Sequence, residues 1–269
     1  MIKVNGIPVD VQAFPDGTAR INAPTPTDEW KHISFTWLYE GDAELFVLQC
    51  LADKYNGFPQ VLMMPYVPHA RMDRVKNAND VFTLKTFCKM INAMDFAQVA
   101  ILDPHSDVTP ALLNHVAVID PALWRKEVIK GDYLTDFPED VVYFYPDAGA
   151  AKRYADETPY TYGVKKRNWE TGQIESLTIA DPEMVKDRDI VIVDDICSYG
   201  GTFSRAAAAL KEAGAKRIYL FVTHCEDNIF KGTVFSDGNI EAVITTNSLI
   251  HADKIDPEYN GKIYVAQLF

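Results

Sequence analysis

Residues 190–204 read IVIVDDICSYGGTFS, and the fold can be predicted outward from this stretch. Its first four residues are β-branched and apolar, which is typical of a strand buried in a parallel sheet. Two aspartates follow, and a short loop then ends in Gly-Gly-Thr. An alanine-rich segment closed by Gly214 predicts a helix, and residues 218–222 predict the next strand. The predicted order is therefore strand, acidic pair, glycine loop, helix and strand.

The glycine loop has the features of a phosphate-binding site. A loop that leads into a helix presents free N–H groups and the positive end of the helix dipole to an anion. Glycine at positions 200 and 201 lets the backbone approach that anion closely. The side chains of Ser198, Thr202 and Ser204 could add hydroxyl donors. We therefore expect this loop to bind a phosphate group.

The acidic pair suits a different part of the same ligand. Asp194 and Asp195 are anions, so they would repel a phosphate. They could instead hold two neighbouring hydroxyls of a sugar, either directly or through Mg²⁺. A phosphate site beside a diol site describes a ribose 5-phosphate. The alternative is that the aspartates merely end a strand and the glycines merely form a turn.

The stretch VIVDDICSYGGT resembles the phosphoribosyl-pyrophosphate (PRPP) motif. This motif occurs in type I phosphoribosyltransferases and in ribose-phosphate pyrophosphokinases (PRPP synthetases), and it does not distinguish the two families. The resemblance implies that Asp194 and Asp195 hold the ribose hydroxyls. It also implies that the 5-phosphate is bound by the loop residues Ser198, Tyr199, Gly200, Gly201 and Thr202.

Composition narrows the classes of function. The chain has 269 residues, of which 48% are hydrophobic, and a formal net charge of −12. This acidic balance argues against a general nucleic-acid binder and against a membrane-surface protein. No stretch has the apolar length of a membrane span or of a signal-peptide core. The four cysteines are scattered without CxxC spacing, so we expect reduced thiols in a cytoplasmic protein.

The tract FPDG near the N-terminus resembles a tract of PRPP synthetases. In that family it reaches into a neighbouring subunit and helps to hold the adenine of ATP. Phe14 and Asp16 match the family pattern, whereas Thr18 stands where the family usually has Glu. The resemblance implies that Phe14 and Asp16 bind ATP. The alternative is a simple hairpin turn, which Pro-Asp-Gly also predicts.

A second tract, ARMD, follows the strand expected at residues 61–64. Open α/β sheets bind ligands at the carboxyl ends of their strands. The tract resembles the PYxRQDR-type loop of PRPP synthetases, in which the Arg contacts ATP phosphates. Arg71 and Asp73 match, and Met72 replaces the usual Gln. The resemblance implies that Arg71 and Asp73 bind ATP, and the alternative is a solvated charge cluster.

Two further tracts point to a magnesium ion. The tract DPH resembles the family's DLH tract, which implies that His105 lies by the ATP phosphates and binds Mg²⁺; Pro104 replaces the usual Leu. The tract PDAG resembles the family's PDxG tract, in which the Asp binds the catalytic Mg²⁺. The resemblance therefore implies a metal site that includes His105 and Asp147. The alternative for Asp147 is a simple cap of the helix that follows it.

The tract KKR resembles the loop that closes over the reacting phosphates in PRPP synthetases. Lys165 and Arg167 align with its two catalytic cations. The resemblance implies that these cations, with His105, are catalytic and neutralise charge at the β-phosphorus of ATP. We expect a loop that is mobile without substrate. The alternative is three cations on a solvated surface.

The six tracts occur in family order along the chain, whereas a phosphoribosyltransferase would explain only the last. The resemblance implies an α/β fold of two tandem type I phosphoribosyltransferase-like domains with central parallel sheets. Residues 1–122 would form the ATP side and residues 123–269 the ribose-phosphate side. It also implies an active site between the domains in a homo-oligomer that shares its sites. The chain resembles a short form that lacks the family's usual C-terminal helix.

The expected reaction moves the diphosphoryl group of Mg·ATP to the 1-hydroxyl of ribose 5-phosphate. Ser198 and Tyr199 replace the family's Asp and Thr, and a Tyr offers a stacking face. A larger acceptor such as ADP-ribose is therefore an alternative. Two others are a phosphoribosyltransferase that consumes PRPP and a non-catalytic partner subunit of a PRPP synthetase.

Overall fold

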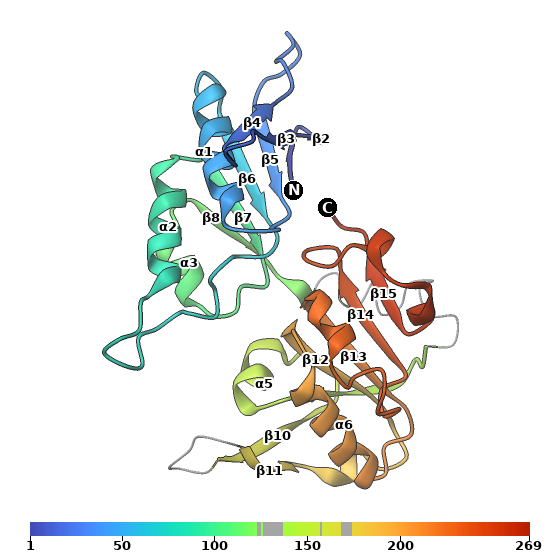
Figure 1. The fold of residues 1–269 in the computed structure, drawn as a ribbon. Helices are drawn as coiled ribbons and strands as arrows, with labels where there is room; N and C mark the ends of the chain where they lie inside the picture. The colour runs from blue at the N-terminus through green and yellow to red at the C-terminus, as the bar shows by residue number, and fades with distance from the viewer. Residues whose placement is uncertain (123–124, 126–136, 157, 168–173) are drawn as a thin grey trace. The chain divides into compact units, whose positions relative to one another are not determined.

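The chain folds into two compact units, Met1–Asp120 together with Phe269, and Pro121–Leu268. Each unit has its own central sheet and its own core, and each is described by itself (Figure 1). The computed structural model describes residues 1–122, 125, 137–156, 158–167 and 174–269.

The first unit is built on a six-stranded sheet in the order β2-β1-β5-β6-β7-β8. Strands β5 to β8 run parallel, and β1 pairs antiparallel with both β2 and β5. The strands are β1 (Ile2–Val4), β2 (Ile7–Pro8), β5 (Ile33–Trp37), β6 (Gln60–Met64), β7 (Gln98–Leu102) and β8 (Val116–Ile119).

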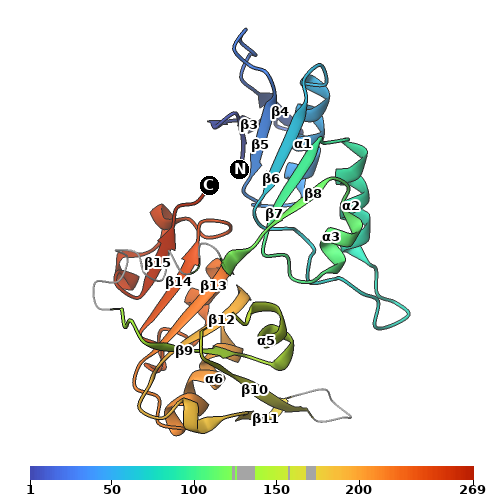
Figure 2. The same ribbon diagram turned by 180° about the vertical axis from the view of Figure 1, so that it is seen from behind.

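The helices of the first unit connect its parallel strands. They are α1 (Ala43–Lys54), α2 (Thr83–Ala93) and α3 (Val108–Leu112). All three lie on the same side of the sheet, as opposite views show (Figure 2). Strand β5 alternates between buried and partly buried positions, so Phe35 and Trp37 enter the core that α1 covers with Leu48 and Leu51.

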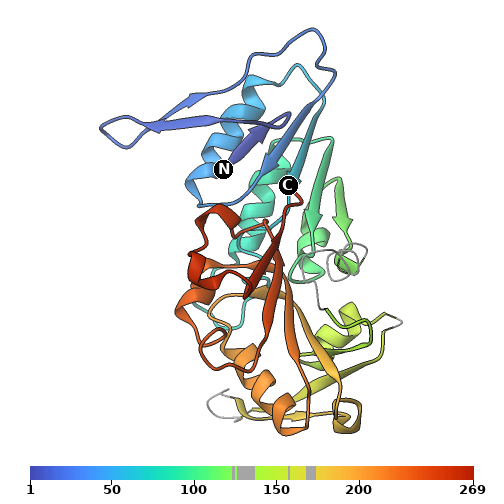
Figure 3. The same ribbon diagram turned by 90° about the vertical axis from the view of Figure 1, so that its right-hand side faces the viewer.

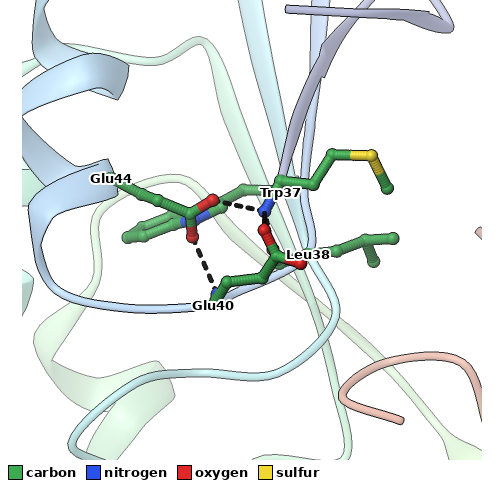
Figure 4. Close-up of polar contacts among 5 residues, drawn as sticks. Trp37, Leu38, Glu40 and Glu44 are labelled. Atoms are coloured by element: carbon green, nitrogen blue, oxygen red, sulfur yellow. Dashed lines mark hydrogen bonds and ion pairs between the residues drawn. The ribbon is translucent and has the colours of Figure 1, made fainter. Parts of the chain in front are cut away.

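Polar contacts around Glu44 hold β1 to the corner where β5 leads into α1 (Figure 4). The indole Nε1 of Trp37 donates to Oε2 of Glu44 at 2.9 Å, and the amide of Glu40 donates to the same oxygen at 2.8 Å. The amino group of Met1 donates to the carbonyl of Leu38 and to the carboxylates of Glu40 and Glu44. One carboxylate therefore links three segments of the first unit.

A separate two-stranded hairpin, β3 (Asp10–Ala13) and β4 (Ala19–Asn22), extends away from the rest of the first unit (Figure 3). Its turn is closed by Asp16, whose Oδ1 accepts from the amide of Thr18 at 3.0 Å and from its hydroxyl at 2.7 Å. Gly17 has a φ of 83°, which favours glycine. The hairpin that Pro-Asp-Gly predicts is therefore present.

The second unit contains a seven-stranded sheet in the order β11-β10-β9-β12-β13-β14-β15. All neighbours are parallel except β10 and β11. The strands are β9 (Val141–Tyr145), β10 (Tyr160–Arg167), β11 (Ile174–Ile179), β12 (Asp189–Cys197), β13 (Ile218–Cys225), β14 (Ala242–Thr246) and β15 (Ile263–Ala266). The α/β fold with largely parallel sheets, which the sequence predicts, is confirmed in both units.

The helices α5 (Ala148–Tyr154) and α6 (Gly201–Glu212) cover opposite faces of this sheet. Successive residues of β12 point to opposite faces of the sheet. Ile192 belongs to the core beneath α6, and Val193 belongs to the core beneath α5. Both faces of the central strands are therefore buried, which accounts for the unbroken apolar run in the sequence.

The last part of the chain closes the sheet without an α-helix. Between β14 and β15 the structure has only the short 3₁₀ turns η3 (Ala252–Lys254) and η4 (Pro257–Tyr259). Two other such turns, η1 (Pro182–Met184) and η2 (Asp227–Lys231), lie earlier in the unit. Over the described ranges, no helix combines the length and apolar character that crossing a membrane requires.

Candidate active site

The acidic pair lies inside a strand, because β12 continues through Asp194 and Asp195 to Cys197. The prediction that the strand ends before the pair was therefore wrong. The apolar run accounts for only part of the strand, and β12 is extended by pairing with β13 as far as Cys197 opposite Cys225. The side chain of Asp195 is almost fully buried, and its amide donates to Oδ1 of Asp194 at 3.0 Å. The carboxylates are thus mounted on a rigid element.

The pKa of Asp194 is raised well above its ordinary value. Burial is the largest cause, the charge of Asp195 is the next, and the charge of Asp147 adds to both. Asp147 follows β9, which is the parallel neighbour of β12. Three acidic side chains therefore share one edge of the sheet. Hydroxyl donors or a cation would relieve their mutual repulsion.

Asp147 caps the helix α5. Its Oδ1 accepts from the amides of Gly149 and Ala150 at 3.1 and 3.0 Å. The capping alternative is therefore correct as a description of the geometry, and the cap also fixes the carboxylate near Asp194. Among the residues that the structure describes, no three His, Cys, Asp or Glu side chains are arranged to hold a metal ion.

The glycine loop occupies residues 198–200, and α6 begins at Gly201. Gly200 has a φ of 74°, and a β-carbon on it would lie 2.1 Å from Cγ2 of Val234. Both the backbone angle and the close approach require glycine there. Its carbonyl accepts from the amides of Phe203 and Ser204, while the first amides of the helix have no partner within it. This is the geometry that the sequence predicts for an anion site.

Two of the expected hydroxyl donors are engaged elsewhere. The hydroxyl of Ser198 donates to Oε2 of Glu226 at 2.6 Å. The hydroxyls of Ser204 and Thr233 lie 2.8 Å apart and share a hydrogen bond. Tyr199 is 57% exposed. In this structure the loop therefore presents backbone amides and an exposed ring more than serine hydroxyls.

In the first unit, the ARMD and DPH tracts follow the neighbouring parallel strands β6 and β7. Asp73 is buried and forms a two-pronged ion pair with Arg74, with Nε–Oδ1 at 2.6 Å and Nη2–Oδ2 at 2.8 Å. The pKa of Asp73 is lowered to about 2, chiefly by the hydrogen bonds from Arg74, with smaller contributions from Ser106 and His105. Because β6 and β7 are parallel neighbours, the two tracts leave the sheet at the same edge.

Other predicted ATP residues of the first unit are accessible. Arg71 and His105 are exposed, and Phe14 at the hairpin turn is 50% exposed. Asp103 has a φ of 41°, so the chain turns sharply just before His105. Asp16 uses one carboxylate oxygen to close the hairpin turn, and these hydrogen bonds from Thr18 lower its pKa.

The whole KKR tract lies in a strand and not in a loop. Lys165 and Arg167 belong to β10, where they lie opposite Leu177 and Ile174 of β11. The register shifts between Lys166 and Arg167. The loop prediction was wrong for these three residues because the antiparallel pairing with β11 extends the strand. Their side chains, and residues 168–173, lie outside the described part of the chain.

Known proteins resemble the chain over most of its length. Residues 148–238 match the phosphoribosyl transferase domain family. The ribose-phosphate pyrophosphokinase of Thermococcus kodakarensis is 29% identical, covering 87% of this chain and 81% of that protein, and that of Sulfurisphaera tokodaii is 28% identical, covering 93% and 87%. The solved PRPP synthetase of Mycobacterium smegmatis has a TM-score of 0.74 and 20% identity, covering 97% and 86%. The chain is therefore similar to ribose-phosphate pyrophosphokinases along nearly its whole length.

Similarity to ribose-phosphate pyrophosphokinases confirms the resemblance inferred from the tracts. These relatives cover both sheet-based units of the chain, whereas the phosphoribosyl transferase match lies in the second unit alone. The alternative of a phosphoribosyltransferase accounts for that match but not for relatives that cover the first unit as well.

Sequence reasoning missed residues around the glycine loop. Glu226 accepts from Ser198 and also from Nδ2 of Asn228 at 3.0 Å. A β-carbon on Gly232 would lie 1.9 Å from the carbonyl oxygen of Tyr199. These residues follow β13, which is the next strand along the chain after β12, and no local motif marks them. Only the pairing of β12 with β13 brings them to the loop.

Proposed function

We propose that this chain transfers the β,γ-diphosphoryl group of ATP to the 1-hydroxyl of ribose 5-phosphate, which gives PRPP and AMP. The observation that carries the proposal is the acidic pair of β12 followed by a glycine loop at the start of α6. The relatives named ribose-phosphate pyrophosphokinase support it, because they cover both units. The second unit would be the ribose-phosphate side.

The acceptor site follows from the charges on β12. The carboxylates of Asp194 and Asp195 would accept hydrogen bonds from the ribose hydroxyls, which removes part of the repulsion that raises the pKa of Asp194. The 5-phosphate would bind the first amides of α6, with Gly200, Gly201 and Thr202 around it. Held at both ends, the ribose would present its 1-hydroxyl in a fixed orientation.

The chemical step exchanges two oxygens at one phosphorus. The 1-hydroxyl oxygen attacks the β-phosphorus, its proton is lost, and the bond from that phosphorus to the oxygen shared with the α-phosphorus breaks. AMP leaves with that oxygen. We assign Lys165 and Arg167, with His105, to the stabilisation of the charge that develops during this exchange.

The first unit would be the ATP side. Arg71 and His105 are exposed, so ATP phosphates could reach them, and Phe14 would offer a face to the adenine. Asp73 is buried in its pair with Arg74, so its contribution to ATP binding would be to orient that guanidinium. Asp16 would act in the same way by fixing the hairpin turn that carries Phe14.

A magnesium ion fits the donor chemistry. Mg²⁺ prefers carboxylate oxygens and water, and the crowding of Asp147 with the β12 carboxylates is what a divalent cation would relieve. We assign Asp147, with His105, to hold it. When bound, the ion would neutralise charge on the ATP phosphates. We also assign the enzyme to the cytoplasm, as a homo-oligomer with shared sites.

A larger acceptor is a second candidate. Tyr199 lies in the loop and is 57% exposed, and the hydroxyl of Ser198 donates to Glu226. An acceptor such as ADP-ribose could stack on that ring, and it would need fewer hydroxyl donors because its 5-phosphate is a diester with a single charge on each phosphate. Both acceptors would undergo the same chemical step.

The decisive experiment measures AMP formation from Mg·ATP with the purified full chain. Ribose 5-phosphate and ADP-ribose are offered in parallel, and omission of the acceptor is the control. AMP with ribose 5-phosphate supports the main proposal, and AMP mainly with ADP-ribose supports the second candidate. AMP with neither, together with base-dependent release of pyrophosphate from PRPP, would replace both with a phosphoribosyltransferase. No turnover in any assay favours a non-catalytic subunit.

A further inference from the structure

The proposed phosphate site has an unusual charge balance. Asp147 and the carboxylates of β12 place negative charge at the same edge of the sheet as the glycine loop. The hydroxyls of Ser198 and Ser204 are engaged by other side chains. A phosphate monoester carries between one and two negative charges near neutral pH. Backbone amides alone would therefore have to offset a large local negative charge.

Arg205, the fifth residue of α6, places a cation beside this loop. A β-carbon placed on Gly201 would lie 3.8 Å from Nη1 of Arg205, so the guanidinium folds back toward the start of its own helix. The side chain is exposed. Across the described residues, no hydrogen bond or ion pair to Arg205 is present, whereas Arg188 and Arg217 pair with aspartates at 2.8 and 2.9 Å.

The position of Arg205 is electrostatically unfavourable without a ligand. The N-terminal end of a helix carries a partial positive charge, which disfavours a cation there. In a chain with 38 acidic and 26 basic residues, a guanidinium has many carboxylates to pair with. Arg205 instead lies where both it and the helix end would be stabilised by the same anion.

We propose that Arg205 binds the 5-phosphate of the acceptor. The inference rests on the proposed function, because it takes the glycine loop as the phosphate site. The guanidinium would donate two parallel N–H groups to two phosphate oxygens, and the amides of α6 would hold the same group from the other side. Arg205 thereby supplies the positive charge that the serine hydroxyls do not.

The test measures binding of ribose 5-phosphate by isothermal titration calorimetry, with the full chain as wild type, Arg205→Ala and Arg205→Lys. Loss of a charge-assisted pair of hydrogen bonds should weaken binding by about 10- to 100-fold in Arg205→Ala. Arg205→Lys should recover part of that loss because it keeps the charge but not the planar fork. Lys211→Ala is the matched control, since it removes one positive charge from the last turn of the same helix.

The companion assay is steady-state AMP formation. Arg205→Ala should raise KM for ribose 5-phosphate while KM for ATP stays within about 2-fold, and Lys211→Ala should change neither. Ribose 5-phosphate binding that is unchanged in Arg205→Ala overturns the inference, and so does an equal loss for both substrates. If the wild type binds ribose 5-phosphate but forms no AMP, the proposed reaction fails and the calorimetry still decides the role of Arg205. A wild type that does not bind ribose 5-phosphate overturns both.

Discussion

Gly200 offers the sharpest test of how the phosphate loop is built. In the Gly200→Ala variant a β-carbon is added where φ is 74°, which costs about 1–2 kcal/mol for an L-residue. That carbon would also lie 2.1 Å from Cγ2 of the fully buried Val234, so one of the two must move. Overpacking of this kind costs about 1–3 kcal/mol. We therefore expect a loss of about 2–5 kcal/mol in the stability of the second unit.

The two contributions can be separated with Val234→Ala. By itself this change deletes two buried methyl groups and should destabilise the unit by about 2 kcal/mol. Combined with Gly200→Ala, it removes the clash and leaves the cost of the backbone angle. The double variant should therefore be more stable than the sum of the single effects predicts, by about 1–3 kcal/mol.

Native-state hydrogen exchange of the β12 and β13 amides is the suitable assay, because it reports the free energy of opening of this sheet alone. AMP formation with ribose 5-phosphate reports the loop itself, and Gly200→Ala should raise KM for that substrate more than for ATP. Single and double effects that add within about 0.5 kcal/mol would refute the contact with Val234. A Gly200→Ala variant as stable as the wild type would refute both contributions.

Two predictions follow from the acidic side chains. The pKa of Asp73 is lowered to about 2 from an ordinary value of 3.8, chiefly by Arg74, so the pair stabilises the fold above about pH 4 and this contribution is lost as the pH falls toward 2. Urea denaturation should show Asp73→Asn to be less stable than wild type at pH 6, and equal stability at pH 6 would contradict the pair's role.

The pKa of Asp194 is raised and not lowered, so its effect on stability is the opposite: wild-type stability should increase as the pH falls through that pKa. Thermal unfolding curves of Asp194→Asn should no longer show this increase, and at pH 7 the variant should melt at a higher temperature than the wild type. It should also lose AMP formation. A lower melting temperature than the wild type would contradict the repulsion between Asp194 and its acidic neighbours.

Local sequence signals were sufficient for the central strands. The run at residues 190–193 is apolar at every position because both faces of β12 are buried, beneath α5 and beneath α6. Gly200 and Gly201 mark the start of α6 for reasons that act within a few residues. Gly200 has a left-handed φ, and the first amides of the helix that begins at Gly201 have no partner within it. Such features can be inferred from one stretch of sequence alone.

Strand ends were not predictable in the same way. Asp194 and Asp195 are poor strand formers, yet β12 includes them because β13 pairs with it two residues beyond the acidic pair. Lys165 and Arg167 belong to β10 because β11 pairs with them. In both cases a partner strand that is distant in sequence supplies the hydrogen bonds, and local propensity is overridden.

The residues around the glycine loop show why the rest of the site could not be predicted. Cys197 lies opposite Cys225 in the parallel register, so the residue after each one leaves the sheet at the same edge. Ser198 and Glu226 therefore meet at 2.6 Å although 28 positions separate them. A shift of this register by one residue would exchange the faces of β13 and move Glu226 away from the loop. The acceptor site thus depends on the pairing of β12 with β13 as much as on the motif, and changes that loosen this pairing should impair acceptor binding even though they touch no residue of the motif.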